Sequence, residues 1–343
     1  MAPILHTLLS RLATSILVLF GVSVLIFCIA RVIPGDPARI ALGPNASAEQ
    51  VAQLRERLRL DEPLPLQYGH FISDLAAGDL GMSLYTNRPV TRDSAQFLPA
   101  TLELVLVSGL LMVAIGLPLG AIAARYRDSW IDHLVRLVAL LGVSAPSFVW
   151  AVVFMLFFAY FLPLFPIEGR LSGGAAAPAD LTGFYLVDAL IAGRLDVAAD
   201  ALYHLVLPAA ALALSGIGQA ARLTRANMVE IYRQPFIEMA RAYGFPERRI
   251  ARAYAFRPAL IPSLTILGLD FAAMLGNAFL VEQVYGWPGL SRYGVQVILR
   301  KDLNAIVGTV LVISAAFLVL NILVDILVSI INPRIRLAGE AAK

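Results

Sequence analysis

Arginine is concentrated in a short stretch that separates two long apolar runs of this chain. The stretch reads FIEMARAYGFPERRIARAYAFRP over residues 236–258, and its arginines are Arg241, Arg248, Arg249, Arg252 and Arg257. Guanidinium groups bind phosphates and carboxylates, so two kinds of binding are open. The stretch could rest on anionic lipid headgroups, or it could dock into a groove of a partner protein.

Two helices are expected around this stretch, with a glycine between them. Pro235 suits a first helical turn, and Glu238 suits the positive end of a helix dipole. Apolar residues follow at helical spacing, namely Phe236, Met239, Ala240 and Tyr243. Gly244 is expected to stop this helix in a left-handed conformation. The second helix is predicted to start at Pro246 and to end at Arg257–Pro258.

Polar side chains inside the apolar runs are the second set of candidate functional residues. Asp270 and Asn277 are seven residues apart with Met274 between them, so the three are expected on one helix face. An aspartate at the centre of a membrane helix costs about 2.5 to 3.5 kcal/mol, so it needs a partner or a wet cavity. Asp270 is therefore a candidate for a transport pathway that attracts cations or amino termini. The alternative is a neutral acid buried between helices.

A second polar pair lies in the last apolar run. Asn321 and Asp325 are four residues apart and therefore share a helix face. A contact between helices that fixes their packing is the simplest role for this pair.

The sequence lacks the motifs of several other kinds of functional site. No G-x-x-x-x-G-K-[ST] loop occurs, so the chain is not expected to bind ATP through a P-loop. The four histidines form no closely spaced metal-ligand pair, and no G-x-S-x-G sequence occurs. We therefore expect neither a metal site, nor a bound cofactor, nor enzymatic activity. A formal net charge of +3 does not indicate nucleic acid as a partner.

The elements that carry these residues follow from composition. The chain is 59% hydrophobic and 15% charged, whereas soluble domains average about 45–50% and about 25%. Six nearly uncharged runs reach the roughly 20 residues that a membrane-spanning helix needs. They cover residues 12–30, 104–124, 137–167, 201–221, 258–281 and 303–333. We predict an all-α membrane protein with six transmembrane helices, in which Pro118, Pro146 and Pro208 can bend the second, third and fourth.

Arginine also indicates the orientation in the membrane. Residues 222–257 hold eight arginines, and short cytoplasmic connections are enriched in arginine and lysine. Six spans place both termini on one side, which is then predicted to be cytoplasmic. Residues 31–103 carry seven arginines, but long translocated segments are largely exempt from this rule. The first run has no A-x-A site before Arg31, so its cleavage as a signal peptide is not expected.

The segment over residues 31–103 is too long for a plain connection. Ser47 and Gln50 form a predicted capping box, and Val51, Leu54 and Leu58 follow at helical spacing. A second helix is expected over Leu66–Ala77, with Gly78 as its end. The segment could pack over the ends of the membrane helices, or it could help to receive a substrate-binding protein.

Several motifs together resemble one family of membrane proteins. Glu238, Ala240 and Gly244 have the spacing of the "EAA" loop of ABC-importer permeases, and the surrounding sequence is similar to the dipeptide, oligopeptide and nickel branch. Other segments resemble the same branch in the same order: IPGDPA (33–38), GDLGMS (78–83), GVSAPSF (142–148), VEQVYGWPGL (281–290) and NILVDILVSIINPRIRL (321–337). Met239, Tyr243, Asp270 and Asn332 depart from the residues that this branch usually has, which bears on substrate preference.

The resemblance implies a permease subunit of the bacterial inner membrane with the ABC type I importer fold and a cytoplasmic coupling-helix loop. Residues 1–30 would form the cytoplasmic N-terminus and first helix, 31–103 an extracytoplasmic segment, 104–333 a five-helix core with the coupling loop 222–258, and 334–343 a cytoplasmic tail. Coupling to the ATPases would involve Phe236, Glu238, Met239, Ala240, Arg241, Tyr243 and Gly244. Asn321 and Asp325 would lie in a helix that supports the bundle.

The implied partners are a second homologous permease, two ABC ATPase subunits that use ATP, and an extracytoplasmic substrate-binding protein. The implied function is import of dipeptides or oligopeptides, although nickel and glycosides are carried by related systems. The alternative is a secondary transporter driven by ions or protons through Asp270 and Asp325. The inverted repeat typical of that class is not visible in the sequence.

Overall fold

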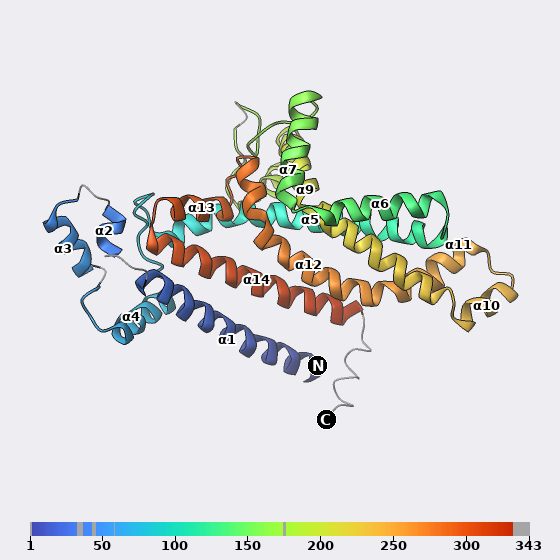
Figure 1. The fold of residues 1–343 in the computed structure, drawn as a ribbon, viewed down its shortest axis with the longest axis horizontal. Coiled ribbons are helices and arrows are strands. Elements are labelled where there is room, and N and C mark those ends of the chain that lie inside the picture. Colours follow the sequence, from blue (N-terminus) through green and yellow to red (C-terminus); the bar gives the residue numbers. More distant parts are fainter. Residues whose placement is uncertain (1, 33–36, 43–45, 58, 174–175, 332–343) are drawn as a thin grey trace. The chain divides into compact units, whose positions relative to one another are not determined.

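The structure is a computed structural model that describes residues 2–32, 37–42, 46–57, 59–173 and 176–331 (Figure 1). Throughout these ranges the regular elements are helices, and the only extended pairing is an isolated bridge between Met82 and Pro89. The predicted all-α class is therefore confirmed.

The helices follow one another in a simple order along the chain. They are α1 (Ala2–Val32), α2 (Pro37–Leu42), α3 (Ala48–Arg57), α4 (Leu64–Ala76), α5 (Val90–Arg125), α6 (Trp130–Ser144), α7 (Ser147–Phe154), the π-helix η1 (Met155–Phe161), α8 (Tyr185–Ile191), α9 (Leu195–Ile231), α10 (Pro235–Ala242), α11 (Glu247–Arg249), the π-helix η2 (Ile250–Phe256), α12 (Arg257–Val284), α13 (Leu290–Leu299) and α14 (Leu303–Ile331). They form two compact units: residues 1–100 with 288–319, and residues 101–287 with 320–343.

Five described helices are long and apolar enough to cross a membrane, and a sixth span is present only if a bent pair is counted as one. The pair is α6 with α7 and η1, which are bent by 106°. The third predicted span is therefore not a continuous helix. Ala145 lies before Pro146 and adopts an extended backbone with ψ of 147°, because proline disfavours a helical conformation in the preceding residue. Pro208, by contrast, is accommodated inside the continuous helix α9.

The second helix of the arginine-rich stretch was predicted to end at Arg257–Pro258, and this prediction is wrong. Residues 247–284 form one helical run through α11, η2 and α12. Pro258 occupies the first turn of α12, directly after the π-helical turns of η2. A wider π-helical turn changes the hydrogen-bond spacing, so the missing N–H of the proline does not end the helix.

The unit that contains the N-terminal segment is built around α13 and the start of α14. Its apolar core includes Val90, Leu290, Tyr293 and Val297. The carboxylate of Asp302 accepts hydrogen bonds from Ser83 Oγ at 2.7 Å and from the Ala305 N–H at 3.2 Å, so it both holds the loop after α4 and caps α14. Asp93, also buried, accepts hydrogen bonds from Thr86, Arg88 and the Tyr293 hydroxyl.

The predicted helices of residues 31–103 are present in this unit. Ser47 N–H donates to Gln50 Oε1 at 2.9 Å and Gln50 N–H donates to Ser47 Oγ at 3.2 Å, which confirms the capping box. The helix α4 ends before Gly78, whose φ of +80° confirms the predicted stop. Leu58 lies outside the described residues. Val90 begins α5, so the second membrane helix starts well before residue 104, where its apolar run begins.

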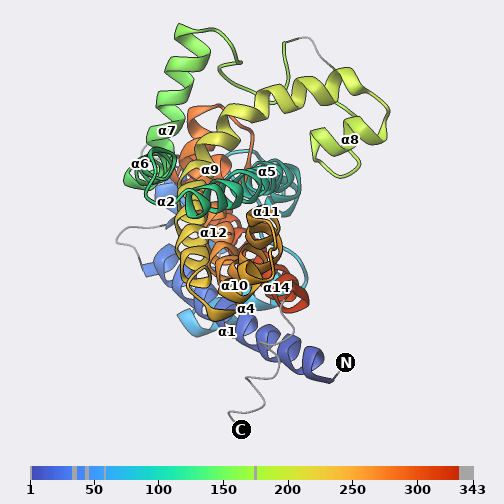
Figure 2. The same ribbon diagram turned by 90° about the vertical axis from the view of Figure 1, so that its right-hand side faces the viewer.

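In the other unit, α9 packs against α6, α7, α8 and α12 (Figure 2). Small residues on α9 permit this close approach: a Cβ atom added at Gly218 would lie 2.5 Å from the carbonyl oxygen of Ala139 on α6. An ion pair strengthens the same contact, because Arg225 of α9 donates from Nε and from a terminal nitrogen to the buried carboxylate of Asp132, each at 2.6 Å.

Candidate functional site

The connection between α9 and α12 contains the short helix α10, which begins and ends as its sequence predicts. Pro235 occupies its first turn, and Glu238 lies in the same turn, where a carboxylate interacts favourably with the helix dipole. At its other end the Phe245 N–H donates to the Ala240 carbonyl at 3.1 Å, and the Gly244 N–H donates to the Arg241 carbonyl at 2.9 Å. With a φ of +75° at Gly244, this is a Schellman motif, so the predicted left-handed stop is confirmed.

A small apolar cluster joins α10 to η2. Ile237 and Ala240 of α10 are buried together with Ile250, the first residue of η2, and Phe245 and Tyr254 pack against them. The rings of Phe245 and Tyr254 stack with their centroids 5.7 Å apart. Because the cluster uses residues from both sides of Gly244, it fixes the angle at which α10 leaves the body of the unit.

Charged groups add a second link across the same turn. Arg241 Nε donates to Glu247 Oε1 at 2.8 Å, and this hydrogen bond raises the pKa of Arg241. The guanidinium of Arg249 lies 4.9 Å from the centre of the Phe245 ring, within the range of a cation–π interaction. Tyr232, which precedes α10, has a buried hydroxyl without a hydrogen-bond partner among the described residues, and burial raises its pKa.

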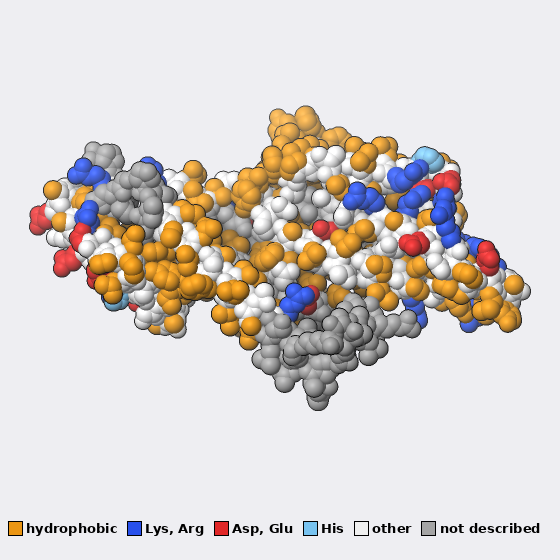
Figure 3. Space-filling model, turned by 60° about the horizontal axis from the view of Figure 1, so that its bottom comes forward, with side chains coloured by type: hydrophobic (Ala, Val, Ile, Leu, Met, Phe, Trp, Pro, Cys, Tyr) orange, Lys and Arg blue, Asp and Glu red, His pale blue; other side chains and the backbone are white. Residues whose placement is uncertain are grey.

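The outer face of α10 remains apolar. The exposed fractions are 41% for Phe236, 56% for Met239 and 74% for Tyr243. Hydrophobic side chains also gather at the end of the unit that carries α10, next to arginines and acids (Figure 3). Large apolar residues that are exposed side by side on one helix face are typical of a surface that binds a partner or a membrane.

In the structure, the residues of the predicted apolar stripe lie on two different faces of α10. Ala240 is only 4% exposed and belongs to the buried cluster rather than to the outer face. Ile237, which the apolar spacing did not single out, is fully buried and anchors the helix. In a helix this short both faces carry apolar residues, so spacing alone does not tell the anchoring face from the exposed one.

The remaining arginines of this stretch are available to anions. Arg248, Arg252 and Arg257 are exposed, and none of them forms an ion pair with another described residue. They continue from α11 into the first turn of α12, where the apolar span begins. The arrangement therefore suits lipid headgroups beside the span as well as an acidic partner, and both of the predicted binding modes stay open at these residues.

The three residues predicted to line a pathway have different environments. Asp270 is half-buried, and its Oδ2 atom has no hydrogen-bond partner among the described residues. Asn277 is exposed. Met274 is buried in the core, where Gly216 of α9 leaves room for its methyl group: a Cβ atom added there would lie 2.8 Å from Met274 Cε. Met274 thus packs between helices, and Asp270 with Asn277 remain the polar candidates.

Asn321 and Asp325 lie on α14, and both are half-buried. Between them in the sequence, Val324 contacts α12 so closely that a Cβ atom added at Gly268 would lie 2.1 Å from Val324 Cγ1. This segment of α14 therefore packs directly on the helix that carries Asp270, and the supporting role of the polar pair stays a prediction.

A buried ionic cluster in the connection between η1 and α9 was not found from the sequence. Arg170 pairs with Glu103 of α5 at 2.5 Å, and both side chains are at most 7% exposed. Its guanidinium lies 3.6 Å from the centre of the Tyr185 ring and 5.5 Å from that of Trp287. The only signal available was Trp287 in the motif VEQVYGWPGL, because the partners are far apart along the chain.

The sequence matches two family models that together cover most of the chain. Residues 116–337 match "Binding-protein-dependent transport system inner membrane component", and residues 4–105 match the N-terminal part of such membrane components.

Curated relatives extend over nearly the whole chain. The chain is 43% identical over 324 residues to the probable D,D-dipeptide transport system permease protein DdpB of Escherichia coli K12, covering 94% of this chain and 95% of that protein. It is 38% identical over 326 residues to the dipeptide transport system permease protein DppB of Alkalihalophilus pseudofirmus, with 95% and 98% covered. It is 37% identical over 334 residues to the di/tripeptide transport system permease protein DppB of Pseudomonas aeruginosa, with 95% and 97% covered.

Proposed function

Because the chain belongs to the family of inner membrane components of binding-protein-dependent transport systems, the ABC-importer permeases, we propose that it forms half of a translocation pore for peptides. Membership of this family makes the chain a transport subunit and not an enzyme. It also favours ATP-driven import over transport driven by ions through Asp270 and Asp325. The names of the relatives, which specify D,D-dipeptides, dipeptides and di- or tripeptides, support a short peptide as the substrate.

The observation that carries the proposal is the exposed apolar face of α10 on a buried anchor. Phe236, Met239 and Tyr243 project from a helix whose inner side is fixed to η2 by Ile237 and Ile250. An ATPase subunit that binds the outer face would therefore move α10 and η2 together. The helical run from Glu247 to Val284 then connects this movement with the segment around Asp270 without a break.

The proposed complex contains a second homologous permease, two ATPase subunits that bind and hydrolyse ATP, and an extracytoplasmic binding protein. In it, residues 31–103 face the outside, the coupling loop 222–258 faces the cytoplasm, and both termini are cytoplasmic. When the ATPases close on ATP, they move α10, and this movement reorients the membrane helices and opens the translocation pore to the outside. The cycle requires two conformational states. Asp270 and Asn277 contribute polar groups to the pathway, and Asn321 with Asp325 support the bundle.

Purification of the tagged chain from native membranes in a mild detergent tests this proposal. We expect a second permease and ATPase subunits to co-purify, and ATP hydrolysis to rise when a peptide-loaded binding protein is added. Binding of the outer face of α10 to an ATPase predicts a crosslink from Met239→Cys to that subunit. Purification of the chain without any ATPase, under conditions that keep the membrane helices folded, would contradict the proposal.

A further inference from the structure

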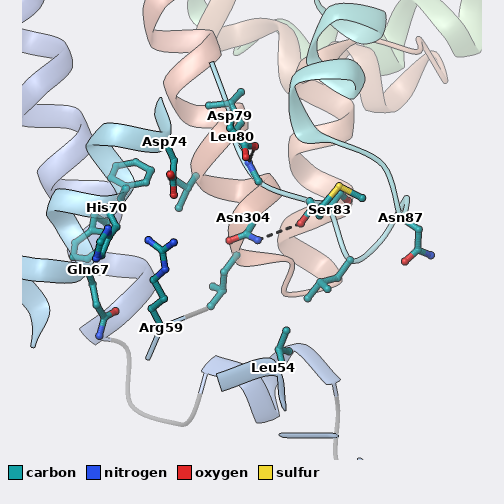
Figure 4. A pocket seen from close by; sticks show the side chains of 17 residues that line it. Leu54, Arg59, Gln67, His70, Asp74, Asp79, Leu80, Ser83, Asn87 and Asn304 are labelled. Atoms are coloured by element: carbon teal, nitrogen blue, oxygen red, sulfur yellow. Dashed lines mark hydrogen bonds between the residues drawn. The ribbon is translucent and has the colours of Figure 1, made fainter. Parts of the chain in front are cut away.

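A cavity of about 470 Å³ lies in the unit formed by residues 1–100 and 288–319 (Figure 4). Its apolar wall comes from Phe27 of α1, Phe71 of α4 and Val307 of α14. Its polar wall comes from α4 itself, from the connections before and after α4, and from Asn304 of α14. Cavities of this size accommodate small organic ligands that combine an apolar part with a few polar groups.

The charged side chains of the cavity lining are those of Arg59, Asp74 and Asp79, of which Asp79 already accepts a hydrogen bond from the Gly81 N–H at 2.7 Å. Arg59 points into the cavity from the connection between α3 and α4, and Asp74 points towards Arg59 from α4 (Figure 4). Both side chains belong to exposed residues, and neither forms an ion pair within 4 Å or a hydrogen bond with another described residue. The Arg59 guanidinium and the Asp74 carboxylate therefore present opposite charges to the same cavity, and neither is held by another described side chain.

The polar wall is held in place by a network of hydrogen bonds. The side-chain amide of Gln67 donates to the carbonyls of Leu60 at 3.2 Å and Glu62 at 2.8 Å, which fixes the turn that carries Arg59. On the opposite wall, Asn304 Nδ2 donates to the Met82 carbonyl at 3.2 Å. These bonds fix the backbone on both sides of the cavity, so its walls do not depend on the charged side chains.

The backbone of this wall also has an unusual conformation. Arg59 and Asn87, which both line the cavity, have a φ of +53°. This left-handed conformation is uncommon for residues other than glycine, and for arginine it is unfavourable. The turn that carries Arg59 at the cavity therefore adopts this conformation at an energetic cost.

We propose that this cavity binds a small zwitterion, an α-amino acid or a short peptide with free termini. The carboxylate of the ligand binds Arg59, its ammonium group binds Asp74, and its side chain lies against Phe27, Phe71 and Val307. A metal ion is a poorer match, because no group of three metal-binding side chains occurs among the described residues. The inference rests on the charges and shape of the cavity and does not require the proposed function.

Protection of an introduced thiol tests the site directly. Leu84 lines the cavity and is 39% exposed, so Leu84→Cys in a Cys28→Ser background places one reactive thiol at the site. The full chain in lipid nanodiscs is labelled with a maleimide in the presence of L-alanyl-L-alanine. We expect the dipeptide to slow labelling, and we expect its N-acetylated and C-amidated forms to have little effect, because each lacks one charge.

Charge variants decide whether Arg59 and Asp74 carry the binding. Arg59→Gln or Asp74→Asn should each raise the half-protecting dipeptide concentration roughly tenfold or more, because each removes a hydrogen bond to a charged group. The double variant Arg59→Asp/Asp74→Arg should restore protection, since the dipeptide can bind in the reverse direction. Arg55→Gln is the matched control, because Arg55 pairs with Asp61 and does not line the cavity.

Two results would overturn the inference: no protection by the dipeptide, or protection that the charge variants and blocked dipeptides leave unchanged. Peptide uptake by the assembled transporter is measured separately. Absence of protection by the dipeptide in the chain that keeps Arg59 and Asp74, together with normal uptake, would refute the cavity site alone. Intact protection in a complex without uptake would count against the proposed function.

Discussion

Gly244 has the most specific conformational requirement of any residue in the candidate site. Its φ of +75° ends α10, yet a Cβ atom added there would meet no other atom within 4 Å. The requirement therefore comes from the backbone angle alone and not from crowding. A β-branched side chain would be strained by roughly 1 to 3 kcal/mol in this conformation.

Gly244→Val should consequently change the direction of α10 without disturbing the membrane helices. We expect the chain to insert normally, while the ATPases detach or hydrolyse ATP without transport. Co-purification of the ATPases, substrate-stimulated hydrolysis and uptake are the measurements. Gly193→Val is the matched control, because Gly193 also has a positive φ and open space but lies between α8 and α9. Wild-type behaviour of Gly244→Val in all three measurements would favour a loop that only rests on lipid headgroups.

Asp270 is the residue whose charge should matter most to a translocated peptide. One of its oxygens has no hydrogen-bond partner among the described residues, and a partly buried carboxylate attracts a nearby cation by a few kcal/mol. Asp270→Asn keeps the shape and removes the charge, so uptake should fall roughly tenfold while the complex stays assembled. Asp325→Asn, by comparison, should mainly reduce the yield of assembled complex. Normal uptake by Asp270→Asn would exclude a role for its charge in the pathway.

At the scale of elements, α10 has two apolar faces with different tasks. The inner face holds the helix to η2, and the outer face is free to bind another protein. The proposal for coupling needs both faces, because a helix that binds an ATPase but is not anchored transmits no movement. The two functions can be separated by substitutions two residues apart.

Ile237→Ala should remove an anchor and cost about 2 to 4 kcal/mol of local stability, because the side chain is fully buried. Limited proteolysis within residues 231–256 should then become faster. Met239→Ala should change stability by no more than about 0.5 kcal/mol, because that side chain is largely exposed, yet weaken co-purification of the ATPase. Equal effects of the two variants on proteolysis would show that the faces are not distinct.

For the whole molecule, the orientation in the membrane is the property on which every proposed role depends. The exposed arginines around α11 and the exposed residues Tyr126 and Trp130 at the turn between α5 and α6 suit a cytoplasmic membrane interface. The two ends of the chain, residue 1 and residues 332–343, lie outside the described residues, so the prediction that both termini are cytoplasmic needs a direct experiment.

Reporter fusions supply that experiment. An alkaline phosphatase fused after Ser172 should be active outside the cytoplasm, and one fused after Arg249 should be inactive, because clustered arginines resist translocation. A fluorescent protein that folds only in the cytoplasm should give the reverse result at the same positions. An external signal at Arg249 would invert the topology and remove the basis for ATPase docking.

Local features of this protein could be predicted from its sequence because they depend on neighbours in the chain. The capping box at Ser47 and the stops at Gly78 and Gly244 each rest on hydrogen bonds or backbone angles within a few residues. The long apolar runs likewise determined where five continuous helices lie, because a membrane helix satisfies its backbone hydrogen bonds internally. Several short motifs in order along the chain, with the spacing around Gly244 as one of them, also suggested the family.

Only the tertiary structure decided which of several similar residues is buried, which is exposed and which forms an ion pair. Whether Ile237 or Phe236 anchors α10, and whether Met274 faces a pathway or a neighbouring helix, depends on contacts with other elements. The same holds for the pairs Asp132–Arg225 and Glu103–Arg170, whose members are 93 and 67 residues apart. Two prolines differ in the same way: Pro146 lies at a break, whereas Pro258 lies inside the continuous helical run of residues 247–284, because the surrounding backbone determines whether a missing N–H can be tolerated.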